Sequence, residues 1–126
     1  MAGDEQIDAV GRTAIGVAYV RARESCRLDR LFADPFALAF VFAAGRDGVI
    51  SRGGSTADLT GRNDLTGRSG SAAFGARMAS HVVVRTRFYD DYLLEASADG
   101  CRQVVLLAAG LDTRAFRLTW PDGAVP

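Results

Sequence analysis

The sequence predicts an α/β fold in which a helical N-terminal segment leads into a buried parallel strand. Two observations support this prediction. Two stretches before residue 100 repeat apolar residues every three or four positions, the spacing of amphipathic helices, and a third short stretch between them is apolar on all sides. Residues 103–107 (QVVLL) are then almost wholly apolar and end at a glycine-containing turn, as buried parallel strands do. We therefore divide the chain into a helical segment, residues 1–100, and the start of a sheet domain, residues 101–126.

The first two helices are predicted from their periodicity and their ends. The first extends to about Glu24 and is defined by apolar residues at helical spacing, namely Ile7, Val10, Ala14, Val17 and Ala18. The second begins at Asp34 and Pro35, because aspartate is a favoured N-cap and proline suits the first helical position. Residues 36–44 are apolar on all sides, so we expect a buried helix with Gly45 as its C-terminal cap.

Residues 45–70 differ in composition, being rich in Gly, Arg, Ser, Thr and Asp, with little to pack. They contain a short duplication, LTGR at 59–62 and again at 65–68. We expect a flexible surface loop. An arginine–glycine segment that binds RNA is the alternative, but it is disfavoured because the stretch has no aromatic residue to stack on bases.

A third helix is predicted over residues 71–97, with Gly100 at its end. Its apolar face is formed by residues three and four positions apart, which are Phe74, Met78, Val82, Tyr89, Tyr92, Leu93 and Ala96. The three valines at 82–84 are β-branched, so a strand beginning there stays open as an alternative. Arg87, Asp90 and Asp91 lie off the apolar face, and we expect them to be solvated.

Arg85 is the first candidate site residue, because it falls between Val82 and Tyr89 on the apolar face. A buried guanidinium is costly unless it is paired. One interpretation is a pair with an internal carboxylate, from Glu24 or Asp112, and the helix pattern alone favours it somewhat. The other interpretation is that Arg85 binds the carboxylate of a ligand through two parallel hydrogen bonds.

The turn after the predicted strand is the second candidate site, and it consists of Ala108, Ala109, Gly110, Leu111 and Asp112. Small residues let a ligand approach the backbone, and amides at a turn and at the start of a following helix favour anionic groups. Asp112 could equally be the N-cap of that helix. The single glycine matches neither a G-x-G-x-x-G dinucleotide motif nor a phosphate loop with its lysine.

The composition limits the possible partners and compartments. Lys+Arg and Asp+Glu each number 15, so the net charge is zero and no charge-dominated nucleic-acid or membrane surface is expected. No metal site is predicted, because Cys26 and Cys101 lack the spacing of metal ligands. Both cysteines are expected to be reduced and buried or half-buried. The single histidine, His81, is expected to be a half-buried packing residue. The chain begins without the basic region of a signal peptide, and residues 36–44 are too short to span a bilayer, so we expect a soluble cytoplasmic protein.

These elements occur in the order found in one known family. The chain resembles bacterial S-adenosylmethionine-dependent methyltransferases related to leucine carboxyl methyltransferases and polyketide O-methyltransferases. The resemblance covers nearly the whole chain and rests on five blocks: RARES at 21–25, LFADPFA at 31–37, VRTRFYDD at 84–91, QVVLLAAGLDTRAFRL at 103–118 and WPDG at 120–123.

The resemblance implies a class I methyltransferase (Rossmann-like) fold with S-adenosylmethionine as cofactor. Residues 103–107 would be its first strand, and Ala108 to Asp112 would form the loop beside the methionine part of the cofactor. Arg85 matches the family's arginine for the methionine carboxylate, which reverses the preference between its two interpretations. Arg21 or Arg23 matches a basic residue near the active site. Ala108 replaces the first glycine of a common G-x-G turn and adds a methyl group near the cofactor.

The resemblance also implies methyl transfer to a carboxylate or hydroxyl oxygen of a small molecule, and no catalytic residue is assigned. The family's next strand, ending in an acidic residue that binds the ribose hydroxyls, is expected after Gly123, where the sequence stops at Pro126. We therefore expect a truncated chain that is marginally stable alone and inactive. The alternative is a non-catalytic remnant, or a fragment that folds only with a partner chain; no oligomeric state is predicted.

Overall fold

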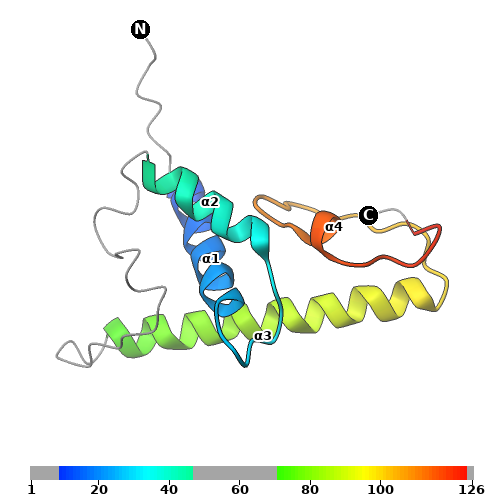
Figure 1. Cartoon of the computed structure of the whole chain (residues 1–126), viewed down its shortest axis with the longest axis horizontal. Helices are drawn as coiled ribbons and strands as arrows, with labels where there is room; N and C mark the ends of the chain where they lie inside the picture. The colour runs from blue at the N-terminus through cyan, green and yellow to red at the C-terminus, as the bar shows by residue number, and fades with distance from the viewer. Residues whose placement is uncertain (1–8, 47–70, 125–126) are drawn as a thin grey trace, which may run out of the picture.

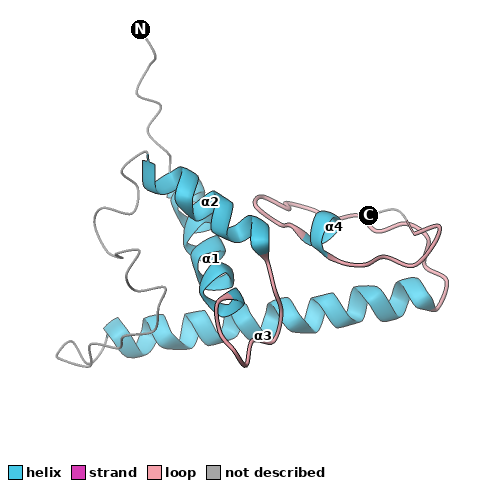
Figure 2. Cartoon of the chain, viewed as in Figure 1, coloured by secondary structure: helices cyan, strands magenta, loops and turns pink. Residues whose placement is uncertain are grey.

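The computed structural model of the chain describes residues 9–46 and 71–124, and these form four helices joined by loops (Figures 1 and 2). The helices are α1 (Ala9–Ser25), α2 (Pro35–Arg46), α3 (Ser71–Ala98) and the short α4 (Arg114–Arg117). Helix α1 packs against both α2 and α3, and residues 101–124 fold back beside the C-terminal half of α3. All three predicted long helices are therefore present, and most of the predicted loop over residues 45–70 lies outside the described residues.

Small side chains hold α1 and α2 close together. Ala18 and Ala22 of α1 meet Ala37 and Val41 of α2 in the buried core, where short side chains permit close helix contact. Helix α2 begins where the sequence predicts, because the Asp34 carboxylate accepts a hydrogen bond from the Ala37 amide at 3.0 Å.

The expectation that α2 is buried on all sides is wrong. Phe36 and Phe42 are exposed, since only the face of α2 that carries its small residues packs on α1. The proposed cap at Gly45 is also wrong, because the helix continues through Gly45 to Arg46.

Helix α3 ends as predicted at Gly100, which adopts the left-handed φ of 108°. The Gly100 amide donates to the Ser97 carbonyl at 3.2 Å and the Cys101 amide donates to the Ala96 carbonyl at 2.9 Å. This pair of bonds is the Schellman motif, in which glycine closes a helix and satisfies its last carbonyls. The valines at 82–84 lie inside α3, so the alternative of a strand there is excluded.

The predicted apolar face of α3 is only partly covered. Val82 is buried, but Met78, Tyr89 and Tyr92 are exposed. In the described part of the chain, α3 is contacted by α1, by the loop between α1 and α2 and by the C-terminal segment, and these do not cover all of its apolar side chains.

The predicted strand over residues 103–107 is not formed among the described residues. The segment is a loop with a single bridge at Gln103, and Val105 and Leu107 are 70% and 87% exposed. A strand needs a neighbour that completes its ladder of hydrogen bonds, and the described segments offer no second strand beside it. The sheet therefore stays a prediction.

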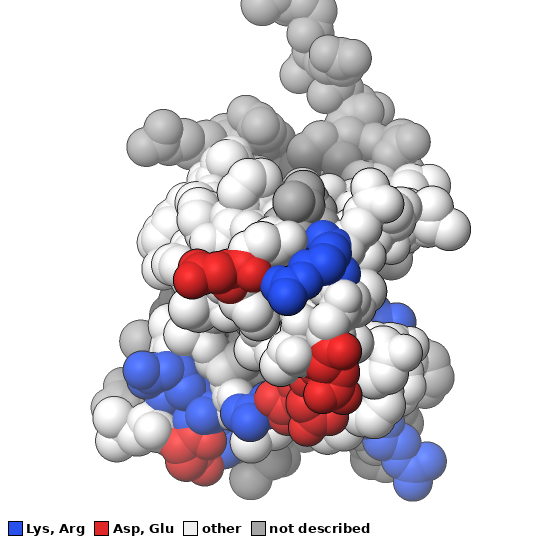
Figure 3. All heavy atoms as spheres, turned by 90° about the vertical axis from the view of Figure 1, so that its right-hand side faces the viewer, with Lys and Arg blue, Asp and Glu red and all other residues white. Residues whose placement is uncertain are grey.

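One face of the molecule shows no dominant charge of either sign (Figure 3). The face at the C-terminal end of α3 is mostly uncharged, with small separate groups of acidic and basic residues (Figure 3). Cys26 and Cys101 are both exposed free thiols, which corrects the expectation that they are buried or half-buried. A search of the described helices finds none that combines the length and the apolar character needed to cross a membrane.

Candidate functional site

A cleft of about 690 Å³ lies between α1, the middle of α3 and the turn that follows residue 107. Clefts of this volume are typical of small-molecule sites. Its lining combines apolar and aromatic side chains with a few polar groups, including Val17, Thr86, Tyr89, Tyr92, Leu93 and residues 105–112. The two candidate regions of the sequence, Arg85 and the turn from Ala108 to Asp112, therefore line one cleft.

The turn presents backbone rather than side chains to this cleft. Ala108 and Gly110 both adopt left-handed backbone angles, with φ of 51° and 53°. The Asp112 amide donates to the Ala109 carbonyl at 2.9 Å and closes the turn. The amides of Ala108 and Gly110 donate no hydrogen bond within the described part of the chain. These N–H groups are free to bind polar or anionic atoms of a ligand.

Two of the three arginines that line the cleft are already paired within the protein. Arg114 donates from Nε to Asp90 Oδ1 at 2.8 Å and also pairs with Asp112. Arg21 is only 8% exposed and donates from Nη2 to the Leu111 carbonyl at 2.6 Å. Its Nε lies 3.1 Å from Asp34 Oδ2, too poorly aligned for a hydrogen bond but close enough for a strong ionic attraction.

Arg85 is the third arginine, and it has no ionic or hydrogen-bond partner among the residues that the structure describes. It is exposed at the cleft, which corrects the expectation of a buried guanidinium. The interpretation as an internal ion pair is wrong, because both proposed carboxylates are engaged elsewhere. Glu24 accepts from the Leu31 amide at 2.7 Å and pairs with Arg27, and Asp112 pairs with Arg114.

A buried polar cluster joins the turn and α4 to the three long helices. Asp34 is fully buried and accepts from Thr113 Oγ1 at 2.7 Å in addition to capping α2. Asp90 is 4% exposed, and its Oδ1 also accepts from Arg117 Nη2 at 2.6 Å. Buried carboxylates are tolerated when they are paired and hydrogen-bonded in this way. The cluster holds the segment that follows the cleft turn against α2 and α3.

Asp90 is the residue that the sequence pattern misplaced, since it was expected to be solvated. It follows Val82 and Thr86 at four-residue intervals, and all three are buried on one stripe of α3. That spacing was the available signal, whereas the pairing of Asp90 with Arg114 and Arg117 depends on the long-range fold. Arg87 and Asp91 pair with each other on the surface, so their predicted solvation is confirmed.

Asp112 acts within its own turn. Its Oδ1 accepts from the Arg114 amide at 2.9 Å, at the start of α4, while the residue in the N-cap position, Thr113, makes no side-chain capping bond. Of the two interpretations of Asp112, the structure therefore favours support of the helix start. His81 is exposed rather than half-buried. The described residues contain no cluster of His, Cys, Asp or Glu side chains that could hold a metal ion.

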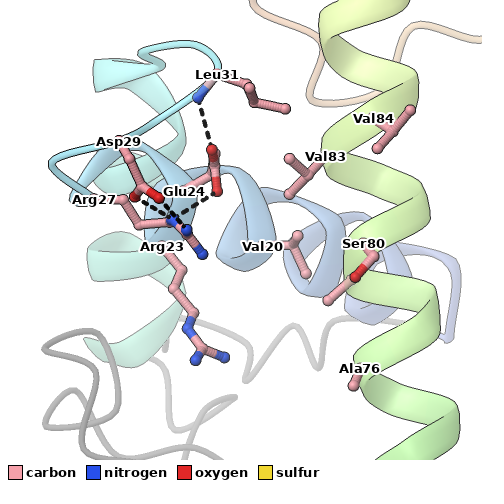
Figure 4. A pocket seen from close by; sticks show the side chains of 11 residues that line it. Val20, Arg23, Glu24, Arg27, Asp29, Leu31, Ala76, Ser80, Val83 and Val84 are labelled. Carbon is pink, nitrogen blue, oxygen red and sulfur yellow. Dashed lines mark hydrogen bonds and ion pairs between the residues drawn. The ribbon is translucent and has the colours of Figure 1, made fainter.

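A second pocket, of about 480 Å³, lies on the other side of α1 and is separate from the turn (Figure 4). Val20 of α1 faces Val83 and Ser80 of α3 across it, and Arg23 extends beside it. Arg21 and Arg23, which both match one basic position of the family, therefore lie at different pockets. Arg21 lines the cleft, and Arg23 lines the second pocket.

The chain is similar in sequence to a group of bacterial proteins. A relative from Frankia alni is 50% identical over 97% of this chain and 39% of its own length. A relative from Parafrankia sp. is 53% identical over 90% of this chain and 33% of its own length. One from Mycobacterium marinum is 45% identical over 94% of this chain and 37% of its own length. All three are named as inferred S-adenosyl-L-methionine-dependent methyltransferases. The model of the leucine carboxyl methyltransferase family matches residues 14–125, and the chain belongs to this family.

Membership of the family implies a class I methyltransferase fold, of which the described residues show the helical portion. The chain spans between 33% and 39% of the length of these three curated relatives.

Proposed function

We propose that the chain is the methyl-donor-binding part of an S-adenosylmethionine-dependent methyltransferase, and that its cleft binds the amino-acid end of S-adenosylmethionine. The observation that carries this proposal is the unpaired Arg85. The other two arginines of the cleft are matched by Asp34, Asp90 and Asp112, so among the described residues the cleft retains one uncompensated cation. A carboxylate is the natural ligand for such a guanidinium.

The remaining lining fits the same group. Ala108 and Gly110 carry at most a methyl side chain and leave the backbone accessible, and the free amides of the turn can donate hydrogen bonds to polar atoms of the ligand. Tyr89 and Tyr92 offer aromatic faces, which attract cations such as a sulfonium. Arg85 would hold the carboxylate, and the turn would lie beside the methionine portion.

The chemistry proposed is methyl transfer to a carboxylate or hydroxyl oxygen of a small molecule. Bound S-adenosylmethionine supplies a methyl group activated by its positive sulfur. The part of this chain is to bind and orient the donor and to limit water around it, which are the main protein contributions to an in-line displacement. A small-molecule acceptor is proposed because the zero net charge and mixed surface favour neither nucleic acid nor a membrane.

Calorimetric titration with S-adenosylhomocysteine and with methylthioadenosine tests this proposal, because only the first carries the amino-acid carboxylate. Arg85→Gln is expected to weaken S-adenosylhomocysteine about tenfold, equivalent to about 1.4 kcal/mol for one exposed charge-assisted contact. The same substitution should leave methylthioadenosine unaffected. Arg77→Gln is the matched control, since Arg77 is an exposed arginine of the same helix that does not line the cleft.

Two results would refute the proposal. One is failure of the folded wild-type chain to bind S-adenosylhomocysteine. The other is an equal loss of affinity for both ligands in Arg85→Gln, because that would place Arg85 away from the carboxylate.

A second candidate is a chain that binds the methyl donor without transferring its methyl group. It is favoured by the exposed, unpaired segment around Val105 and Leu107, where a sheet would have to form. Incubation with S-adenosylmethionine and a panel of carboxylic acids and phenols separates the two candidates. Release of S-adenosylhomocysteine supports the enzyme, whereas donor binding with no release from any acceptor supports the non-catalytic chain.

A further inference from the structure

We infer that Arg21 is a positioning residue that fixes the cleft turn in the orientation needed to bind the methyl donor. It acts through the Leu111 carbonyl, while Arg85 contacts the ligand directly. This inference rests on the proposed function for its ligand, but the positioning itself rests on contacts within the chain.

The peptide between Leu111 and Asp112 is held at both of its polar ends. The Leu111 carbonyl accepts from Arg21 Nη2 at 2.6 Å, and the Asp112 amide donates to the Ala109 carbonyl at 2.9 Å. Because a peptide unit is planar and rigid, fixing its oxygen and its N–H sets the orientation of the whole unit. Gly110 directly precedes this unit, so the contact with Arg21 also limits how the exposed part of the turn can rotate.

The Leu111 side chain provides a second anchor. It packs against the alanine and valine core between α1 and α2, within which Ala18 and Ala22 are fully buried. The core thus holds the side chain of Leu111, and Arg21 of the same helix α1 holds its carbonyl. The turn is thereby attached to α1 through Arg21 and to the shared core of α1 and α2 through the Leu111 side chain.

The surroundings of Arg21 explain why its guanidinium stays in this position. Burial lowers the pKa of Arg21 from its usual value, and the nearby carboxylates of Asp34 and Asp112 act in the opposite direction. Asp34 is itself fixed, because it caps α2 and accepts from Thr113. The planar guanidinium can therefore face Asp34 through one nitrogen and the turn through another, a geometry that a lysine ammonium cannot reproduce.

The roles of Arg21 and Arg85 can be separated by experiment. Arg21→Lys retains a positive charge for Asp34 but loses the two-sided contact. We expect hydrogen exchange of the Asp112 amide to accelerate at least tenfold in this variant, with exchange in the middle of α3 unchanged. Affinity for S-adenosylhomocysteine should fall about three- to tenfold. Arg85→Gln should lose affinity with no change in the exchange of the Asp112 amide.

Each outcome has a defined meaning. Unchanged exchange and affinity in Arg21→Lys overturn the inference, and a loss of affinity without faster exchange overturns it in favour of direct ligand contact. If the wild-type chain binds no S-adenosylhomocysteine, the proposed function fails, but accelerated exchange still supports the positioning of the turn by Arg21. If Arg21→Lys loses the circular dichroism signal of its helices, Asp34→Asn is the substitute variant. The asparagine amide oxygen can still cap α2, while the negative charge beside Arg21 is removed. This variant should show the same faster exchange of the Asp112 amide.

Discussion

Ala108 occupies a backbone conformation that glycine adopts more easily, so Ala108→Gly should stabilise the chain. Its φ of 51° is left-handed, and a residue with a Cβ there costs about 1–2 kcal/mol. Glycine loses more freedom on folding, which offsets about 0.5–1 kcal/mol of this gain. The net stabilisation expected is therefore about 0.5–1 kcal/mol. Gly110 has nearly the same φ, 53°, with open space around its missing side chain, so Gly110→Ala should destabilise by a similar amount.

Thermal unfolding followed by circular dichroism measures both effects. For a domain of this size, about 0.5–1 kcal/mol corresponds to a shift in Tm of roughly 2–8 °C, upward for Ala108→Gly and downward for Gly110→Ala. The two sites are two residues apart and both are exposed, so each variant is a control for the other. Equal Tm values for the wild type and Ala108→Gly, or a lower value for the variant, would refute the argument from backbone strain.

Further substitutions test the helix end and the buried cluster. Gly100→Ala should destabilise the chain by about 1 kcal/mol or more, because the φ of 108° at this position disfavours any residue with a Cβ. Gly16→Ala, in the middle of α1 where no atom would touch the added Cβ, should stabilise it by about 0.5–1 kcal/mol. Chemical denaturation of both variants checks these opposite signs. Asp90→Asn should cost about 2–3 kcal/mol, since it weakens two hydrogen bonds to buried arginines, and the neighbouring Asp91→Asn should cost less than about 1 kcal/mol because its pair with Arg87 is exposed. Equal losses for Asp90→Asn and Asp91→Asn in the same denaturation series would show that the buried cluster does not stabilise the fold.

Local signals in the sequence located the ends of the helices well. Asp34 caps α2 and Gly100 ends α3, as their residue types predict, because a cap depends on a few neighbouring atoms. The burial of whole faces was predicted less well. Tyr89 and Tyr92 have the spacing of core residues but are exposed, since burial depends on which other elements are present to cover the helix.

The sequence predicted residues that line the candidate site, but it did not predict which side chains pair with each other there. The sequence indicated that Arg85 and Gly110 belong to one site, and the structure brings both to the same cleft. It did not indicate that Arg21 would bind the Leu111 carbonyl, 90 residues along the chain, or that Arg114 would be neutralised by Asp90. Such pairings depend on the relative placement of helices, which periodicity within one segment cannot specify.

The buried charges are better explained by geometry than by stability. Replacing a whole buried ion pair with well-packed apolar residues is often neutral or stabilising, although removing one partner alone is costly. The ion pairs of Asp34 and Asp90 are therefore not explained by a gain in stability over an apolar core. These carboxylates determine how the segments that they connect are placed. Each binds groups from segments far apart in the sequence, and together they fix where the turn and α4 lie on the helices. Among the described residues that line the cleft, this pairing leaves the guanidinium of Arg85 without a carboxylate partner, and for that reason we propose it as the group that binds the donor's carboxylate.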